Sequence, residues 1–116
     1  MQAKRKKTAM NDAQIAEASR LFGLLAEPAR LYLLRALMEG PSSVTGLVEA
    51  TGMKQGNVSK HLGVLLTSRF VKRERQGNFA VYEIADPSLY QLCDLMCCRI
   101  QEDAERQAEA VTLGKR

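Results

Sequence analysis

Three cysteines within six residues are the side chains best suited to chemistry. The segment CDLMCC contains Cys93, Cys97 and Cys98, and the chain has no other cysteine. Thiolates select soft, thiophilic ions and also undergo reversible oxidation. Cys93 and Cys97 are four residues apart and share a helix face, whereas Cys98 is turned by about 100° from Cys97. Three convergent thiols would therefore require a distorted helix or a second chain, and otherwise only two act together.

A second candidate segment, GNVSKHLGVL at 56–65, contains the chain's only histidine. Val58, Leu62 and Leu65 recur at helical spacing, which predicts a helix that packs on a core through these residues. The polar side chains that we expect on its outward, N-terminal part are Gln55, Asn57, Ser59, Lys60 and His61. Gln and Asn pair with adenine edges, Ser with bases or phosphates, and Lys with phosphate. For His61 the alternative is a bond to a nearby backbone group that orients the helix.

Positive charge gathers in the middle of a chain whose net charge is +4. Six basic residues and one acid lie between 54 and 75, whereas four basic residues and seven acids follow from 76 to the end. A local basic surface favours a polyanion such as nucleic acid, although a solvated charged face has the same pattern. The run KRKK, Lys4–Lys7, is either a DNA-binding arm or an aid to solubility.

Helical periodicity predicts helices over 12–27, 28–40, 42–52, 54–69 and 86–116. Between the last two, residues 70–85 alternate in polarity around a turn at 76–78, which predicts a β-hairpin. The length of 116 residues suits one domain over 12–112, preceded by a basic flexible arm over 1–11. The chain has no apolar run of about 18 residues and no secretory signal pattern, so we expect a cytoplasmic protein without a membrane partner.

Two short helices joined by a glycine turn form a helix-turn-helix unit, and a basic hairpin directly after it is typical of a wing. The predicted fold is therefore a mainly α winged helix-turn-helix of order α-α-α-α-β-β-α. In the hairpin, Arg73, Arg75 and Gln76 are expected to bind phosphates or to enter the minor groove. The alternative is a charged edge strand that resists aggregation.

Three stretches together resemble the ArsR/SmtB group of small bacterial winged-helix repressors. They are LLAEPARLYLLRAL, GMKQGNVSKHLGVLLTSRFV and KRERQGNFAVYEIAD, in the order and spacing of that family. The resemblance implies a transcriptional repressor that is a homodimer through its first and last helices. It also implies that double-stranded operator DNA with an inverted repeat is the partner, and that an inducer releases it.

The sequence departs from the ligand patterns that this resemblance implies. The stretch SVTG at 43–46 lacks the two cysteines of the third-helix metal site. Asp86 is retained from the last-helix zinc site, but Ser88 stands where a histidine would be. Arg35 occupies the second-helix position that carries a cysteine in the redox and persulfide sensors. Zinc sensing through the usual ligands is therefore not expected.

The cysteines of the last helix remain as the inducer site. The first hypothesis is that Cys93, Cys97 and Cys98 bind trivalent arsenic (arsenite) or a related thiophilic metalloid, with no tightly bound cofactor. The second is a disulfide or persulfide switch on the same thiols. The third is that the cysteines only pack as small apolar residues in the dimer interface. We expect no enzyme, because the sequence shows no combined nucleophile, base and orienting residue.

Overall fold

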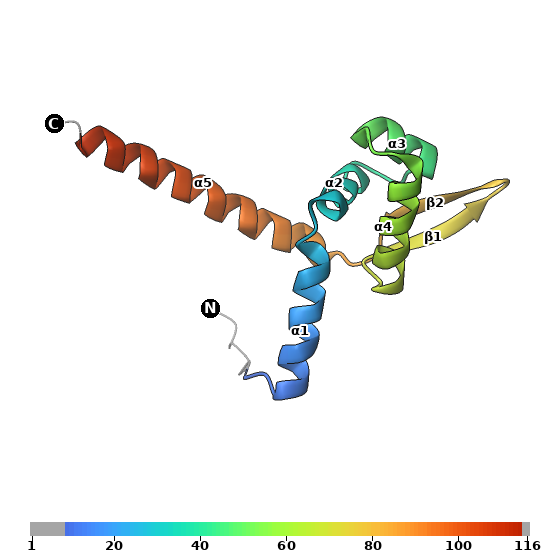
Figure 1. The fold of residues 1–116 in the computed structure, drawn as a ribbon, viewed down its shortest axis with the longest axis horizontal. Helices are drawn as coiled ribbons and strands as arrows, with labels where there is room; N and C mark the ends of the chain where they lie inside the picture. The colour runs from blue at the N-terminus through green and yellow to red at the C-terminus, as the bar shows by residue number, and fades with distance from the viewer. Residues whose placement is uncertain (1–8, 115–116) are drawn as a thin grey trace, which may run out of the picture.

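The computed structural model describes residues 9–114, and five helices and one hairpin follow one another in the predicted order (Figure 1). The elements are α1 (Asp12–Leu25), α2 (Pro28–Leu37), α3 (Val44–Thr51), α4 (Gln55–Thr67), β1 (Val71–Gln76), β2 (Phe79–Ile84) and α5 (Ser88–Gly114). The run Lys4–Lys7 lies outside the described residues. The predicted fold class, a winged helix-turn-helix, is confirmed.

Local capping signals set the helix boundaries. The Asn11 side chain accepts a hydrogen bond from the Gln14 backbone N–H, and the Gln14 side chain accepts one from Asn11 N–H, which is a capping box. Ser43 caps α3 by accepting from Gly46 N–H. Gly52 ends α3 at φ 75°, a left-handed conformation that glycine adopts without steric cost.

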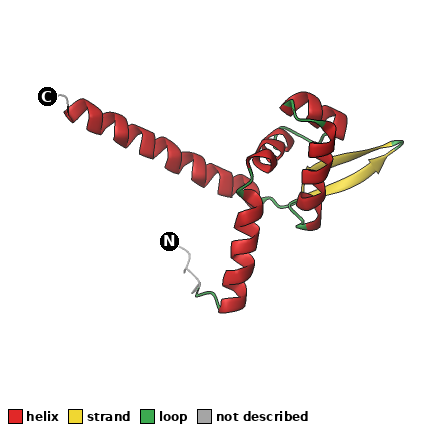
Figure 2. Ribbon diagram, in the orientation of Figure 1, coloured by secondary structure: helices red, strands yellow, loops and turns green. Residues whose placement is uncertain are grey.

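Helices α2, α3 and α4 pack with the hairpin around one apolar core. Its buried side chains are Leu33, Leu34, Leu37, Leu47, Val58, Leu62, Leu65, Phe70, Val71, Tyr82 and Leu89. We call α2, α3, α4, β1 and β2 the winged-helix body. Figure 2 shows the hairpin extending beyond α4 as the only strands among residues 9–114. Helix α4 and the hairpin are therefore held by the same core.

The wing is a two-stranded antiparallel hairpin in which Val71 pairs with Ile84 and Gln76 with Phe79. Its tight turn contains Gly77 at φ 67°. Two backbone hydrogen bonds between Ser42 and Tyr82, of 2.9 and 2.8 Å, attach β2 to the segment before α3. The base of the wing is thus fixed to the helix-turn-helix unit.

Helices α1 and α5 extend away from the body (Figure 1). No residue of α1 is buried, and its Ile15 and Phe22 are exposed. In α5, Leu89 is buried against the body, whereas Leu95, Met96 and Ile100 are exposed. Large apolar side chains at helical spacing are thus left uncovered by a single chain. We call α1 and α5 the outer helices.

Candidate nucleic-acid interface and thiol cluster

Helix α4 buries one face and exposes the other. Val58, Leu62 and Leu65 are completely buried, which confirms their predicted role in holding the helix to the body. The predicted base- and phosphate-binding residues that are exposed are Gln55, Asn57, Ser59 and Lys60. These four side chains lie on the first two turns of α4, where polar groups are free to meet a major groove.

The prediction that His61 lies on the outward face is wrong. Only 7% of its surface is exposed, and its Nδ1 accepts a hydrogen bond of 3.1 Å from Arg30 Nε. Burial lowers the pKa of His61 below its ordinary value of 6.5, with Arg30 and Lys60 lowering it further and Glu27 raising it. A buried imidazole requires a partner, and here the partner is a side chain of α2 and not a backbone group.

The exposed face of the wing is basic. Arg73, Arg75 and Gln76 are exposed on β1, as expected for residues that approach a polyanion. Lys72 forms an ion pair of 3.6 Å with Glu83 of β2. Among the residues that the structure describes, Arg73 and Arg75 are therefore the cations of β1 that form no salt bridge.

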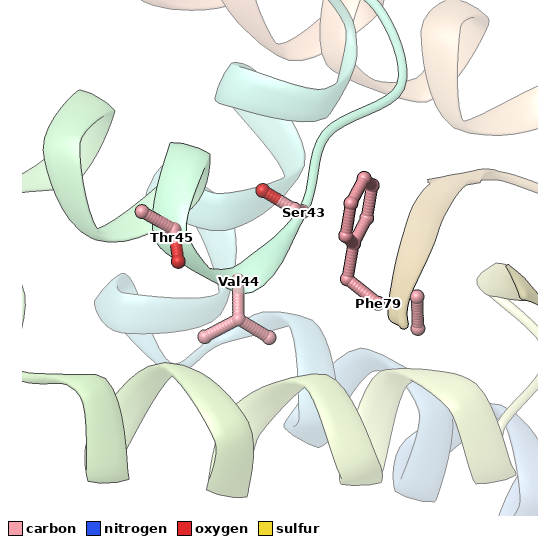
Figure 3. A pocket seen from close by; sticks show the side chains of 5 residues that line it. Ser43, Val44, Thr45 and Phe79 are labelled. Carbon is pink, nitrogen blue, oxygen red and sulfur yellow. The ribbon is translucent and has the colours of Figure 1, made fainter. Parts of the chain in front are cut away.

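A shallow cavity of about 350 Å³ lies between the wing and the start of α3. Figure 3 shows Phe79 of β2 beside Ser43, with Val44 and Thr45 on the α3 side. Phe79 is 59% exposed at the wing tip. Sequence alternation places Phe79 in the predicted hairpin, but nothing local indicates which segment lies next to it.

The three cysteines are free and unequally exposed. Cys93 is half-buried, whereas Cys97 and Cys98 are exposed. Burial raises the pKa of the Cys93 thiol, and the neighbouring Cys97 and Asp94 raise it further. No group of three metal-ligating side chains comes together within the described part of one chain. A three-thiol site on these cysteines therefore stays a prediction that requires a distorted helix or a second chain.

The positions that correspond to other metal or redox sites have structural contacts instead. The Asp86 carboxylate accepts hydrogen bonds from the Ser88 N–H at 3.0 Å and the Ser88 hydroxyl at 2.6 Å, before the first turn of α5. The guanidinium carbon of Arg35 lies 5.1 Å from the centre of the Tyr32 ring. These residues therefore stabilise helix ends and surfaces.

Comparison with known proteins identifies the family. The model of the arsR family of bacterial regulatory proteins matches residues 27–73, which include α2, α3, α4 and the start of β1. A probable mercury resistance operon repressor from Streptomyces lividans is 34% identical over 86 residues, which are 74% of this chain and 69% of the relative. The chain belongs to the arsR family. Its relatives are DNA-binding transcriptional regulators and not enzymes.

Other relatives agree with this assignment. The transcriptional regulator NmtR from Mycobacterium tuberculosis is 44% identical over 70 residues, 60% of this chain and 58% of that regulator, so the match spans less than two thirds of its length. The crystal structure of the antimony-specific repressor AntR has a TM-score of 0.75 at 34% identity, covering 90% of this chain and 98% of that one.

A solved relative is described as a homodimer. It is the winged helix-turn-helix DNA-binding domain of a possible ArsR-family regulator from Mycobacterium bovis, with a TM-score of 0.73 and 27% identity. The match covers 86% of this chain and 95% of that domain.

Within residues 9–114 of this chain, no helix is long and apolar enough to cross a membrane.

Proposed function

We propose that this arsR-family chain is a cytoplasmic, homodimeric repressor that a thiophilic inducer releases from operator DNA. Helix α4 binds base edges and phosphates in the major groove through Gln55, Asn57, Ser59 and Lys60. The wing contacts the flanking backbone or minor groove. The inducer, trivalent arsenic or a related metalloid, binds the cysteines of α5.

The observation that carries the DNA-binding proposal is the exposed polar start of α4 on a helix whose opposite face is fully buried. Because Val58 and Leu62 are completely buried, the exposed side of α4 is held in one orientation. Arg73 and Arg75 on the adjacent wing are exposed and supply charge for phosphates. A rigid polar helix next to a basic hairpin is suited to a groove and its phosphate edges.

The proposal of a homodimer rests on the outer helices. Phe22 of α1 is 61% exposed, and Ile100 of α5 is 60% exposed. Apolar surface of this kind on a soluble domain marks an interface. In a two-fold dimer the two copies of α4 face an inverted repeat, with half-sites spaced by one or more turns of DNA.

The inducer site is proposed to form when α5 meets its copy. One chain does not bring three ligands together, but a two-fold axis near α5 doubles the number of thiols available. The names of two relatives refer to mercury and antimony, which are thiophilic elements. In arsenite binding each thiol replaces one hydroxide of As(OH)₃, and each replacement releases one water. Ligation across the interface changes how the two bodies are spaced.

A redox switch is the second candidate. The exposure of Cys97 and Cys98 favours it, because exposed thiols are accessible to oxidants and to sulfane sulfur. Purely structural packing accounts for the half-buried Cys93 within one chain, whereas Cys97 and Cys98 would need a covering partner chain to pack in this way.

Fluorescence anisotropy of the fully reduced protein tests the proposal. The probe is a labelled duplex from the promoter of the gene encoding this chain, with and without stoichiometric arsenite. We expect a complex that weakens steeply with salt and that arsenite dissociates. The matched control replaces all three cysteines with serine, which should keep DNA binding and lose the response.

Each outcome of this titration is decisive. No salt-dependent complex with any promoter duplex would contradict DNA binding. A complex that arsenite leaves intact, but that a mild oxidant or a polysulfide dissociates, would replace the metalloid proposal with the redox one. A response that persists in the triple serine variant would exclude the cysteines altogether.

A further inference from the structure

The C-terminal end of α1, the start of α2 and the middle of α4 are joined by one arginine. Arg30 donates from Nε to His61 Nδ1 at 3.1 Å and from Nη1 to the Leu24 carbonyl oxygen at 3.1 Å. These two bonds connect the recognition helix α4 with the outer helix α1. No sequence pattern indicated this connection, because Arg30 and His61 are 31 residues apart.

The Leu24 carbonyl needs a partner from outside its helix. In a continuing helix it would accept from the residue four positions later, but that residue is Pro28, which has no N–H. The Arg30 guanidinium supplies the missing donor. The same proline that begins α2 thus leaves an acceptor at the end of α1 for Arg30 to bind.

The bond to His61 exists only when the imidazole is neutral. Arginine is always a donor, so His61 Nδ1 must carry no proton and the ring proton is on Nε2. Protonation of Nδ1 would turn it into a second N–H donor facing Arg30 Nε–H, and it would place two positive charges next to each other. The charged groups that act on His61 are Arg30 on α2, Lys60 on α4 and Glu27 at the N-cap of α2. Of these, only Glu27 favours the protonated ring.

We propose that Arg30 and His61 are positioning residues that set the orientation of α4 relative to α1, so that operator affinity depends on a neutral His61. Helix α1 has no buried residue, so this bonded link supplements a small packing contact. Protonation of His61 opens the link and lets the recognition helix shift against the outer helix. The inference rests on the proposed function only in requiring that α4 binds DNA.

The direction of the pH effect follows from the lowered pKa of His61. Because the ring is harder to protonate in the folded protein than in the unfolded chain, its contribution to stability is complete above pH 6.5 and decreases as the pH falls. Operator affinity should fall over the same acidic range. It should be unaffected between about pH 7 and pH 8, where the imidazole is neutral.

The test compares the wild type with His61→Asn in anisotropy titrations at pH 7.5 and 5.5. The probe is a duplex selected from a random library by the wild-type protein at pH 7.5. In this variant an amide oxygen takes the place of Nδ1 and accepts from Arg30, but it cannot be protonated. We expect similar affinities at pH 7.5 and an additional loss of up to about tenfold for the wild type at pH 5.5. Parallel pH profiles would overturn the proposal.

A second pair of variants tests Arg30 directly. Arg30→Met keeps the aliphatic stem and removes both donors, so it should weaken operator binding at pH 7.5 by about tenfold and remove the additional loss at pH 5.5. Arg35→Met, on the same helix but exposed, is the matched control and should bind as the wild type does. Equal affinities for Arg30→Met and the wild type at pH 7.5 would contradict a positioning role.

A measurement on the wild type decides the link even if a variant does not fold. His61 is the only histidine, so the ¹⁵N spectrum has a single imidazole to assign. We expect the Nε2–H tautomer at pH 7.5 and a titration below 6.5; an Nδ1–H tautomer or a higher pKa would overturn the link. If the wild type binds no duplex at pH 7.5, the proposed function fails, whereas the tautomer still tests the link separately.

Discussion

The winged-helix body and the outer helices differ in how far one chain completes their packing. In the body, Leu33, Leu47 and Leu62 are completely buried. On the outer helices, by contrast, Phe22 and Ile100 are about three-fifths exposed. The body therefore has its own core, whereas α1 and α5 present apolar surface that a second copy is suited to cover. The shape of the proposed DNA-binding surface is set within one chain, and in the proposed dimer the spacing of two such surfaces is set between chains.

This division places the proposed sensing thiols where packing is least complete. Cys97 and Cys98 are exposed on α5, outside the core. A tightly packed core resists small adjustments, whereas weakly packed elements change position at little energetic cost. A coupling free energy of about 1–3 kcal/mol between inducer and DNA is enough for regulation. Ligation at the interface can supply it without disturbing the body.

The largest expected effect on stability comes from disrupting the core of the winged-helix body. Leu62→Ala removes a completely buried side chain of α4 and should lower the free energy of unfolding by about 3 kcal/mol. Urea denaturation followed by circular dichroism measures it. Thr67→Ala, at an exposed position of the same helix, is the control and should change stability by less than about 0.5 kcal/mol. Similar losses in the two variants would mean that the core does not stabilise the body.

A charge placed on the outer helices should separate the copies while leaving each body folded. Ile100→Asp puts a carboxylate in the proposed interface and should raise the dimer dissociation constant by at least about tenfold, with helix content retained. Sedimentation velocity over a range of protein concentrations measures it. Gln101→Asp adds the same charge at the next residue and should have a smaller effect. An equal effect of the two substitutions would place the interface elsewhere.

Relieving backbone strain in the body should change the free energy of unfolding by less than Leu62→Ala does, and in the opposite direction. Arg69, just after α4, has φ 66°, a left-handed conformation that costs a residue with a Cβ roughly 1 kcal/mol. Arg69→Gly should therefore raise the free energy of unfolding by up to about that amount. Arg69→Ala removes the same charge but keeps the Cβ, and it should bring no such gain. If both variants gain stability equally, the charge is responsible and not the conformation.

The smallest expected difference lies within the thiol cluster. Because burial raises the pKa of the Cys93 thiol and so lowers its thiolate fraction, a variant with Cys97→Ser and Cys98→Ser should react with iodoacetamide several-fold more slowly at pH 7.5 than one retaining only Cys97. The rate for Cys93 should still rise above pH 9, because more of the thiol ionises there. Equal rates at pH 7.5 would show that the half-burial of Cys93 does not protect it.

Local signals account for the part of the fold that was predictable from the sequence. Asn11, Gly52 and Gly77 each act within a few residues of the boundary they define, so the order of the elements and the hairpin turn could be predicted from the sequence. The alternation of buried and exposed positions on α4 was also readable at Val58, Leu62 and Lys60. Periodicity is sufficient to predict whether a residue is buried wherever its environment depends on its near neighbours in the sequence.

Contacts between distant segments account for the rest. His61 lies on the same face of α4 as Val58 and Leu65, but its polarity suggested an outward position. Its burial depends on Arg30, which approaches from another helix. Similarly, the resemblance implied an interface through α1 and α5, but their apolar stripes alone did not show which side chains a single chain leaves exposed. Sequence periodicity identifies an apolar face and says nothing about what covers it.

The first strand of the wing has a consequence for how such regulators diverge. In β1 only Val71 is buried, and the next five side chains are exposed. Substitutions at exposed positions usually change stability by less than about 0.5 kcal/mol. After a gene duplication, these five positions are therefore open to mutation with almost no folding penalty. With β1 contacting DNA as proposed, a daughter repressor is able to acquire a new operator preference by drift in this strand while it inherits the core unchanged.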